Sequence, residues 1–335
     1  MKLGLGLIVK NESEDLPACL DSFLPHVDVA CIIDTGSVDN TLEIAKLACE
    51  RHKVTYSIHS FFDANDDNGL IENFSLARNE YVKRLENLAV DYIINCDADD
   101  TLLTPILRQE IEQSGADYVA INYRMDSGAV FHSYKIWKAK TKTRFVGKVH
   151  ESANVDWSKK IYESKIMYQH KYSSPANQEN GTARNLRILK KEIYPPLRSI
   201  FYYANECVDS KNYQEAVKWY LEYIRRCNEG EPNWFIELAH CYFRAARWLN
   251  YLGNQSEAIR LSKELLNKDP TWSESWCELA FTYIERGEYE AAIECAQAAL
   301  KNEFKPRLFS EKDKYNETPH FLIAKAKFPN ALKEM

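Results

Sequence analysis

Three aspartates fall within four residues in the middle of the sequence, at Asp97, Asp99 and Asp100. They follow an apolar run typical of a buried strand, so we expect them at the end of that strand. Neighbouring carboxylates repel one another unless a cation or hydrogen-bond donors compensate their charge. If the segment is extended, alternate side chains place Asp97 and Asp99 on one side. A divalent cation that carries substrate phosphates would compensate them, although such aspartates can also cap a following helix.

The sequence is poor in the glycines with which loops bind phosphate. It has 11 glycines in 335 residues and contains neither a GxxxxGK[ST] nor a GxGxxG segment. This absence excludes a P-loop and an ordinary dinucleotide site. We therefore expect a divalent cation, Mn²⁺ or Mg²⁺, to be the partner of a substrate pyrophosphate.

Two other predicted strands also end in polar residues. Asn11 and Glu12 follow the first strand, and Asp34 ends the second. At the carboxyl end of a parallel strand, a carboxylate can accept a hydrogen bond from a ribose hydroxyl or a base N–H. The residues that follow Asp34, among them Ser37 and Asp39, are explained by a tight turn and a helix cap.

The first part of the chain alternates between strand and helix patterns. This alternation predicts an α/β fold with a mostly parallel sheet, helices on both faces and a ligand crevice at the carboxyl ends of the strands. An acidic stretch, residues 63–72, predicts a loop beside that crevice. The predicted strands are Leu3–Lys10, Val29–Asp34, Val54–Ser60, Asp91–Cys96, Tyr118–Met125 and His132–Lys138, and the predicted helices are Glu14–Phe23, Thr41–His52, Phe74–Leu88 and one that starts near Pro105.

The second part of the chain is helical and repetitive. The blocks Lys211–Ala216, Gly253–Ala258 and Gly287–Ala292 align, and the last two lie 34 residues apart. That spacing is the tetratricopeptide period. From Ala239 to Ala258 the distance is seven residues longer than from Ala280 to Ala292, which predicts one helix elongated by about two turns. We expect an α/β domain over residues 1–175 and a helical linker with tetratricopeptide-like repeats over 176–335.

Taken together, four blocks in the first domain resemble the family 2 glycosyltransferases of GT-A fold, a Rossmann-like α/β architecture. They are Leu7–Glu12, Asp34–Thr41, Phe74–Asn79 and Asp97–Asp99. With the appended repeats, the chain is similar to a subgroup that includes bacterial peptide S-glycosyltransferases. The resemblance implies inverting transfer of a sugar from a nucleoside diphosphate donor, with UDP favoured, to a hydroxyl, thiol or amine of a peptide, protein or glycan.

The resemblance also implies roles for individual residues. Those for the donor nucleotide are Asn11, Glu12, Asp34, Arg78, Asn79 and Asp97, and those for the metal are Asp97, Asp99 and His170. The base that takes the acceptor proton would be Glu151, next to His150. The alternatives are that His150 and Glu151 form an ordinary hydrogen-bonded pair and that His170 is structural.

Composition narrows the function further. The net charge of −6 provides no global positive field for a nucleic-acid backbone. The apolar run Leu3–Val9 is far shorter than the ~20 residues that span a bilayer, so we expect neither secretion nor a transmembrane segment. Nine cysteines without a CxxC pair indicate reduced core thiols in a cytoplasmic protein.

Two functional classes remain after these exclusions. In the first, the chain is an active glycosyltransferase of the hexosyl or N-acetylhexosaminyl class whose repeats bind the acceptor or mediate a homodimer. In the second, an inactive nucleotide-binding GT-A domain serves a tetratricopeptide scaffold. The retained Asp34, Arg78, Asp97 and Asp99 favour the first class, because an inactive domain has no need of mutually repelling aspartates.

Overall fold

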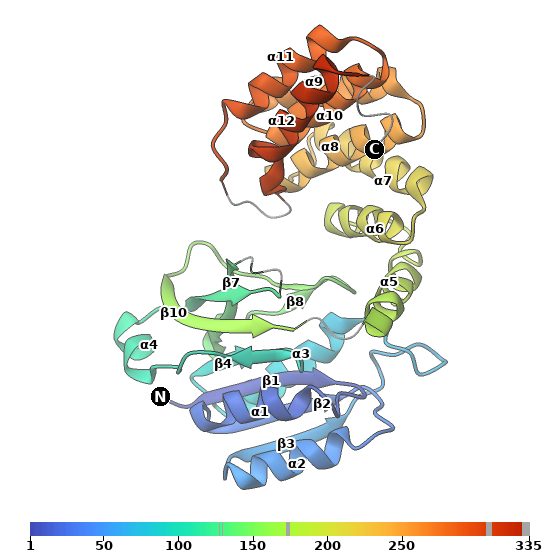
Figure 1. Ribbon diagram of the computed structural model, residues 1–335. Coiled ribbons are helices and arrows are strands. Elements are labelled where there is room, and N and C mark those ends of the chain that lie inside the picture. Colours follow the sequence, from blue (N-terminus) through green and yellow to red (C-terminus); the bar gives the residue numbers. More distant parts are fainter. Residues whose placement is uncertain (127, 129, 172–174, 306–309, 330–335) are drawn as a thin grey trace. The chain divides into compact units, whose positions relative to one another are not determined.

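The protein consists of two compact units, Met1–Arg184 and Asn185–Met335. The computed structural model, shown in Figure 1, describes residues 1–126, 128, 130–171, 175–305 and 310–329. The division lies within helix α5 (Pro175–Leu189), close to position 175, where the sequence pattern changes. Each unit has hydrophobic clusters of its own.

The first unit is built on one eight-stranded sheet with the order β3-β2-β1-β4-β7-β6-β10-β5. Strands β1 to β4 run parallel to one another, whereas β7 is antiparallel to both β4 and β6, and β5 is antiparallel to β10. The mostly parallel sheet expected from the alternating pattern is confirmed. The strands are β1 (Leu3–Val9), β2 (Val29–Asp34), β3 (Thr55–Ser60), β4 (Tyr92–Asn95), β5 (Asp100–Leu102), β6 (Tyr118–Arg124), β7 (Val130–Lys138) and β10 (Ile161–His170).

Helices cover both faces of this sheet. Apolar residues of α1 (Leu16–Phe23) and α2 (Thr41–Arg51) pack with one set of alternate residues of β1 and β2, and those of α3 (Phe74–Asn87) pack on the opposite face. On β1, Gly6 faces α3, and a Cβ atom there would lie 2.1 Å from Cδ2 of Tyr81. Because Gly6 has no side chain, α3 can approach the sheet closely, and α3 carries Arg78 and Asn79 of the expected donor site.

Strand β10 was not predicted as a strand. It has ten residues and lies between β6 and β5, with an irregularity in its pairing between Glu163 and Met167. Its buried positions Ser164, Ile166 and Tyr168 alternate with more exposed ones, which is the period of a half-buried strand. Polar residues within the strand make this period hard to recognise in the sequence. The strand ends at His170. Helix α4 (Arg108–Ser114) and the short hairpin of β8 (Phe145–Val146) and β9 (Ser152–Ala153) complete the unit.

The second unit is an array of helix pairs. Ala216, Ala258 and Ala292 are buried and each is the fourth residue of its helix, so the repeats predicted from these alanines are confirmed. The helices are α6 (Leu197–Asp209), α7 (Tyr213–Asn228), α8 (Phe235–Tyr251), α9 (Gln255–Lys268), α10 (Ser273–Glu285), α11 (Tyr289–Leu300) and α12 (Glu317–Lys327).

The expected two-turn elongation in the middle repeat is wrong in its size. Helix α8 has 17 residues and α10 has 13, so the difference is about one turn. Counted from the C-terminal helix ends, Ala246 rather than Ala239 corresponds to Ala280, and this seven-residue shift of alignment accounts for the whole difference in spacing. Ala245 and Ala246 are both buried, which shows that the apolar face continues along α8.

All nine cysteines are free, and eight of them are buried. Their interpretation as core thiols is therefore confirmed. Of the helices in the part of the chain that the structure describes, none combines the length and the apolarity needed to cross a membrane.

Candidate active site

The loops that follow β1 and β2 are joined by hydrogen bonds. The backbone N–H of Asn11 donates to Oγ of Ser37 over 3.1 Å, and Oδ1 of Asn11 accepts from the backbone N–H of Val38 over 2.8 Å. The backbone N–H of Glu12 donates to Oγ1 of Thr41 over 2.7 Å. Asn11 has a φ of 57°, a left-handed conformation that asparagine tolerates better than most residues. Asn11 and Glu12 are thus fixed beside the end of β2.

Asp34 ends β2 at the same edge of the sheet, where it pairs with Val9 of β1. Its side chain is buried, and Oδ1 accepts from the backbone N–H of Ser37 over 2.9 Å. The backbone N–H of Ser37 in the turn after β2 therefore holds the carboxylate in place.

Glu12 is half-buried and lies among other carboxylates at this edge. Burial, assisted by Asp99, Asp15, Asp97 and Asp39, raises the pKa of Glu12 to about 7. A buried carboxyl group with carboxylates around it holds its proton more strongly than an exposed one does. A bound cation would relieve this repulsion.

The segment after β4 is a turn, so the expectation of an extended segment with Asp97 and Asp99 on one side is wrong. The backbone N–H of Asp100 donates to the carbonyl oxygen of Asp97 over 3.0 Å, which closes the turn. Asp97 and Asp99 consequently have different partners. Short strand β5 then starts at Asp100, where it pairs with His170 at the end of β10.

Asp99, Asp100 and His170 form a cluster with the geometry of a cation site. One ligand atom from each lies within 4.8 Å of the other two, and Nδ1 of His170 lies 3.6 Å from Oδ1 of Asp99 and 3.4 Å from Oδ1 of Asp100. Burial and the neighbouring Asp97 raise the pKa of Asp99 to about 6, although His170 opposes the shift. Burial opposes protonation of His170, but Asp100 and Asp99 outweigh it and raise the pKa of that histidine.

The donor set of this cluster fits a divalent cation. Carboxylate oxygens are ligands for both Mg²⁺ and Mn²⁺, and an imidazole nitrogen beside them is better suited to Mn²⁺ than to Mg²⁺. The ring of Tyr123 stacks on His170, with centroids 5.8 Å apart, which fixes the plane of the imidazole.

Asp97 lies outside this cluster and binds two basic side chains. Oδ1 accepts from Nη2 of Arg78 over 2.5 Å, and Oδ2 accepts from Nζ of Lys135 over 2.8 Å. Burial favours protonation of Asp97, but these two cations hold its pKa well below the usual range. Asp97 therefore carries a full negative charge that the chain itself compensates.

Lys135 and Asp100 are the residues whose roles the sequence did not reveal. Asp100 is fully buried, and its carboxylate accepts from Nζ of Lys135 over 3.3 Å and from the hydroxyl of Tyr123 over 2.6 Å. Lys135 comes from β7, which lies between β4 and β6 in the sheet. The sequence signal that could have identified Lys135 is the presence of a lysine inside the predicted strand His132–Lys138.

The expected base, Glu151, lies in the turn between β8 and β9. Its side chain is 9% exposed, and Oε1 accepts from Nε of Arg78. Gly147 and His150 in the same turn have φ values of 102° and 51°. Asn79 positions this hairpin, because its side chain exchanges two hydrogen bonds with the backbone of Phe145, of 3.0 and 2.8 Å. Arg78 thus links Glu151 to Asp97. The side-chain amide of Asn79 makes its hydrogen bonds to the backbone of β8.

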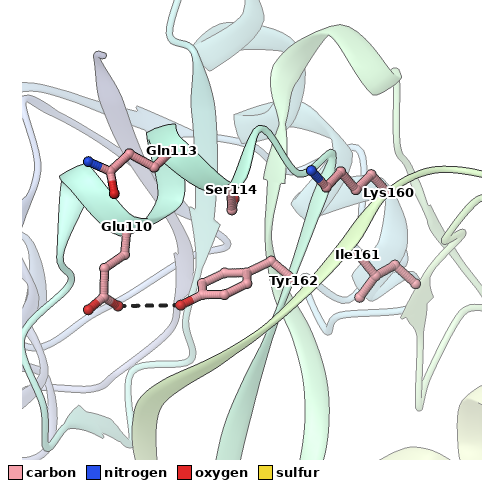
Figure 2. A pocket seen from close by; sticks show the side chains of 6 residues that line it. All are labelled: Glu110, Gln113, Ser114, Lys160, Ile161 and Tyr162. Carbon is pink, nitrogen blue, oxygen red and sulfur yellow. Dashed lines mark hydrogen bonds between the residues drawn. The ribbon is translucent and has the colours of Figure 1, made fainter.

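A pocket of about 460 Å³ lies away from this site and takes no part in it. Figure 2 shows it between α4 and the first residues of β10, where the hydroxyl of Tyr162 donates to Oε2 of Glu110 over 3.4 Å. His170 ends β10 at the other edge of the sheet, about 30 Å away for a strand of this length.

The glycosyl transferase family 2 model matches residues 5–191, more than half of the sequence. The chain belongs to glycosyl transferase family 2. The match covers β1 to β10, so the family 2 domain contains all of the clustered residues described above. The tetratricopeptide repeats follow it.

The chain is also similar to proteins with tetratricopeptide repeats. A TPR repeat-containing protein of Synechococcus elongatus is 27% identical over 202 residues, which are 56% of this chain and 46% of that protein. The Hsp70-Hsp90 organizing protein of Triticum aestivum is 31% identical over 98 residues, 29% of this chain and 16% of that protein. This chain therefore spans less than half the length of either. MamA from Desulfovibrio magneticus is a similar solved structure with 15% identity and a TM-score of 0.35, covering 48% of this chain and 84% of that one.

Proposed function

We propose that the family 2 domain transfers a hexosyl or N-acetylhexosaminyl group, with inversion, from a UDP sugar to a peptide, protein or glycan. The observation that carries this proposal is the cluster of Asp99, Asp100 and His170 at the sheet edge where Asp34 and Glu12 also lie. Acidic groups that face one another at the carboxyl ends of parallel strands have a reason to exist if a cation and a diphosphate bind there.

In this proposal, different side chains bind the cation, the donor nucleotide and the acceptor proton. Asp99, Asp100 and His170 would hold Mn²⁺ or Mg²⁺, which neutralises charge on the departing diphosphate when bound. The free oxygen of Asp34 accepts from the uracil or the ribose of the donor. Asn11 and Glu12 border the same donor position, and the guanidinium of Arg78 binds both Asp97 and Glu151.

Glu151 is the proposed base for the acceptor proton, with His150 beside it in the turn. Its contact with Arg78 fixes the direction of the carboxylate, and this contact must loosen before Glu151 can take a proton. The same contact favours a second candidate function, in which the domain binds a nucleotide without transferring a sugar and the repeats serve as a scaffold. The relatives named for their repeats fit this alternative as well.

One experiment separates the two functions. The full chain is incubated with Mn²⁺ and, in turn, with each of a panel of nucleotide sugars. Slow hydrolysis of the donor is followed by measuring the nucleoside diphosphate that it releases. An active transferase hydrolyses one donor in preference, and Glu151→Gln lowers the rate by about 10²-fold or more while UDP affinity stays the same. Glu43→Gln, an exposed change on α2, serves as the control. Binding of UDP without turnover of any donor supports the scaffold, and absence of binding overturns both.

The repeats are the proposed acceptor-binding part of the chain. Tetratricopeptide arrays present long surfaces for peptides, and they also mediate association of identical chains. Light scattering of the full chain measures whether it forms a homodimer. The acceptor proposal is tested separately, by detecting the transferred sugar on a peptide or glycan.

A further inference from the structure

One connection in the second unit is much longer than the others. Residues 301–316 link α11 to α12, whereas the connections from α6 to α11 have three to six residues. Connections longer than about 12–15 residues inside a compact domain are uncommon and are usually functional segments or linkers. The described part of this one nearest α12, residues 310–316, contains a 3₁₀ turn (Lys312–Tyr315) and packs against α10. We call residues 310–316 the inner segment.

A carboxylate of the inner segment is bound by arginines of α8. Nη1 and Nη2 of Arg247 lie 2.9 and 2.8 Å from the two carboxylate oxygens of Glu311. Nη1 of Arg244, one turn earlier on α8, lies 3.8 Å from the same group. Two parallel N–H···O bonds recognise the shape of a carboxylate as well as its charge. Arg247 is in turn oriented by Glu278 of α10, which accepts from its Nε over 2.8 Å.

A second contact has the opposite polarity. Glu274 of α10 is fully buried, and its two oxygens accept from the backbone N–H of Glu311 over 3.0 Å and from the hydroxyl of Tyr315 over 2.9 Å. A buried carboxylate is costly unless donors satisfy it. Helix α10 therefore presents an acceptor that the inner segment satisfies with two donors spaced four residues apart.

The inner segment makes these polar contacts and also buries the side chain of Tyr315, which is 7% exposed. Its other contacts include a hydrogen bond that Sγ of Cys277 on α10 donates to the carbonyl oxygen of Lys314 over 3.5 Å. The ring of Tyr315 also packs on Phe304 with centroids 5.3 Å apart. The next helix, α12, is anchored separately, because Leu322 is buried in the cluster formed with α10 and α11. Release of the inner segment would thus leave the helices on either side of it packed.

We propose that Arg244, Arg247 and Glu274 form a peptide-binding site that the inner segment occupies, and that a glutamate-containing segment of a partner protein competes for it. The partner segment that fits has a glutamate followed four residues later by a tyrosine, as in Glu311 and Tyr315. The inner segment is tethered at both ends, so its effective concentration is about millimolar and a partner must overcome it. The site is independent of the sugar transfer proposed above.

The test uses the full chain and a fluorescein-labelled synthetic peptide with the sequence of residues 310–318. The double variant Glu311→Gln/Tyr315→Phe weakens the hold on the inner segment without changing its size. Fluorescence anisotropy should show that this variant binds the peptide about tenfold or more tightly than the wild type does. Adding Arg247→Met should remove the binding, whereas adding the exposed change Arg286→Met should not.

Equal peptide affinity of the wild type and the double variant overturns the proposal, and so does binding that survives Arg247→Met. If the double variant does not fold, hydrogen exchange of the wild type decides instead. Millimolar labelled peptide should then accelerate exchange of the chain's own inner segment, which the label distinguishes by mass from the added peptide. Unchanged exchange means that the segment is a permanent part of the fold.

Discussion

His170 and Asp100 face each other across the antiparallel pair of β10 and β5, and Nδ1 of His170 lies 3.4 Å from Oδ1 of Asp100. Seventy residues separate them in the chain. Asp100 also accepts from Tyr123 and Lys135, so its carboxylate is fixed before any cation binds. This arrangement fixes the imidazole next to Asp99, and a preorganised ligand set binds metal without first having to be ordered.

The first prediction concerns the cation cluster. Thermal unfolding of the wild type should move to higher temperature with Mn²⁺ and UDP, by the equivalent of about 2.7 kcal/mol when the ligand is at 100 times its dissociation constant. Asp99→Asn and His170→Gln should lose most of this shift, because each removes a ligand. Asp67→Asn, an exposed change in the acidic loop, should keep it. A full shift in both cluster variants would place the cation elsewhere.

Lys135→Met should destabilise the fold by about 3–5 kcal/mol, because it leaves buried Asp100 without its cation and half-buried Asp97 with Arg78 alone. Urea unfolding in the presence of a chelator, followed by fluorescence, measures the loss without a metal that could take the place of the ammonium group. The matched control is Lys46→Met on the exposed side of α2, which should change the free energy of unfolding by less than about 0.5 kcal/mol. A cost below ~1 kcal/mol for Lys135→Met would show that water compensates the aspartates.

His240 of α8 should make the repeats sensitive to acid. Burial, with Arg244 and Arg247 nearby, holds the pKa of His240 well below its usual value. The unfolded chain therefore takes up a proton near pH 6.5 that the folded chain does not, so this stabilisation is complete above pH 6.5 and is lost as the pH falls below it. Between pH 7.5 and 5.5, the wild type should lose about 1.4 kcal/mol more than His240→Gln does.

Urea unfolding of the full chain at the two pH values tests this difference. Five of the seven tryptophans lie in the second unit, so intrinsic fluorescence reports mainly on the repeats. In the neutral state, Nε2 of His240 donates to Oδ1 of Asn205 over 3.2 Å, a bond that glutamine can replace. Equal losses in the wild type and in His240→Gln would mean that other groups cause the acid sensitivity.

Local patterns predicted much of the fold. The alternation of apolar runs and helical periods identified β1, β2, β3, β4, β6 and β7 and the helices between them, because these elements bury residues at the period of their own backbone. Strand β10 escaped because polar Ser164 takes one of its buried positions and apolar Met167 one of its more exposed ones, which weakens the alternation in the sequence. The alanines of the repeats were equally readable, since close helix packing requires a small residue at the same place in each pair.

The sequence by itself determined the kinds of elements, the two-part division and the presence of acidic groups at the ends of strands. Only the tertiary structure decided which partner each aspartate has. Local spacing suggested that Asp97 and Asp99 act together, but the turn separates them, so that Asp97 pairs with Arg78 and Lys135 while Asp99 lies with His170. Lys135 reaches Asp97 because antiparallel β7 pairs with β4, and the order of strands in a sheet depends on long-range contacts that no local period records.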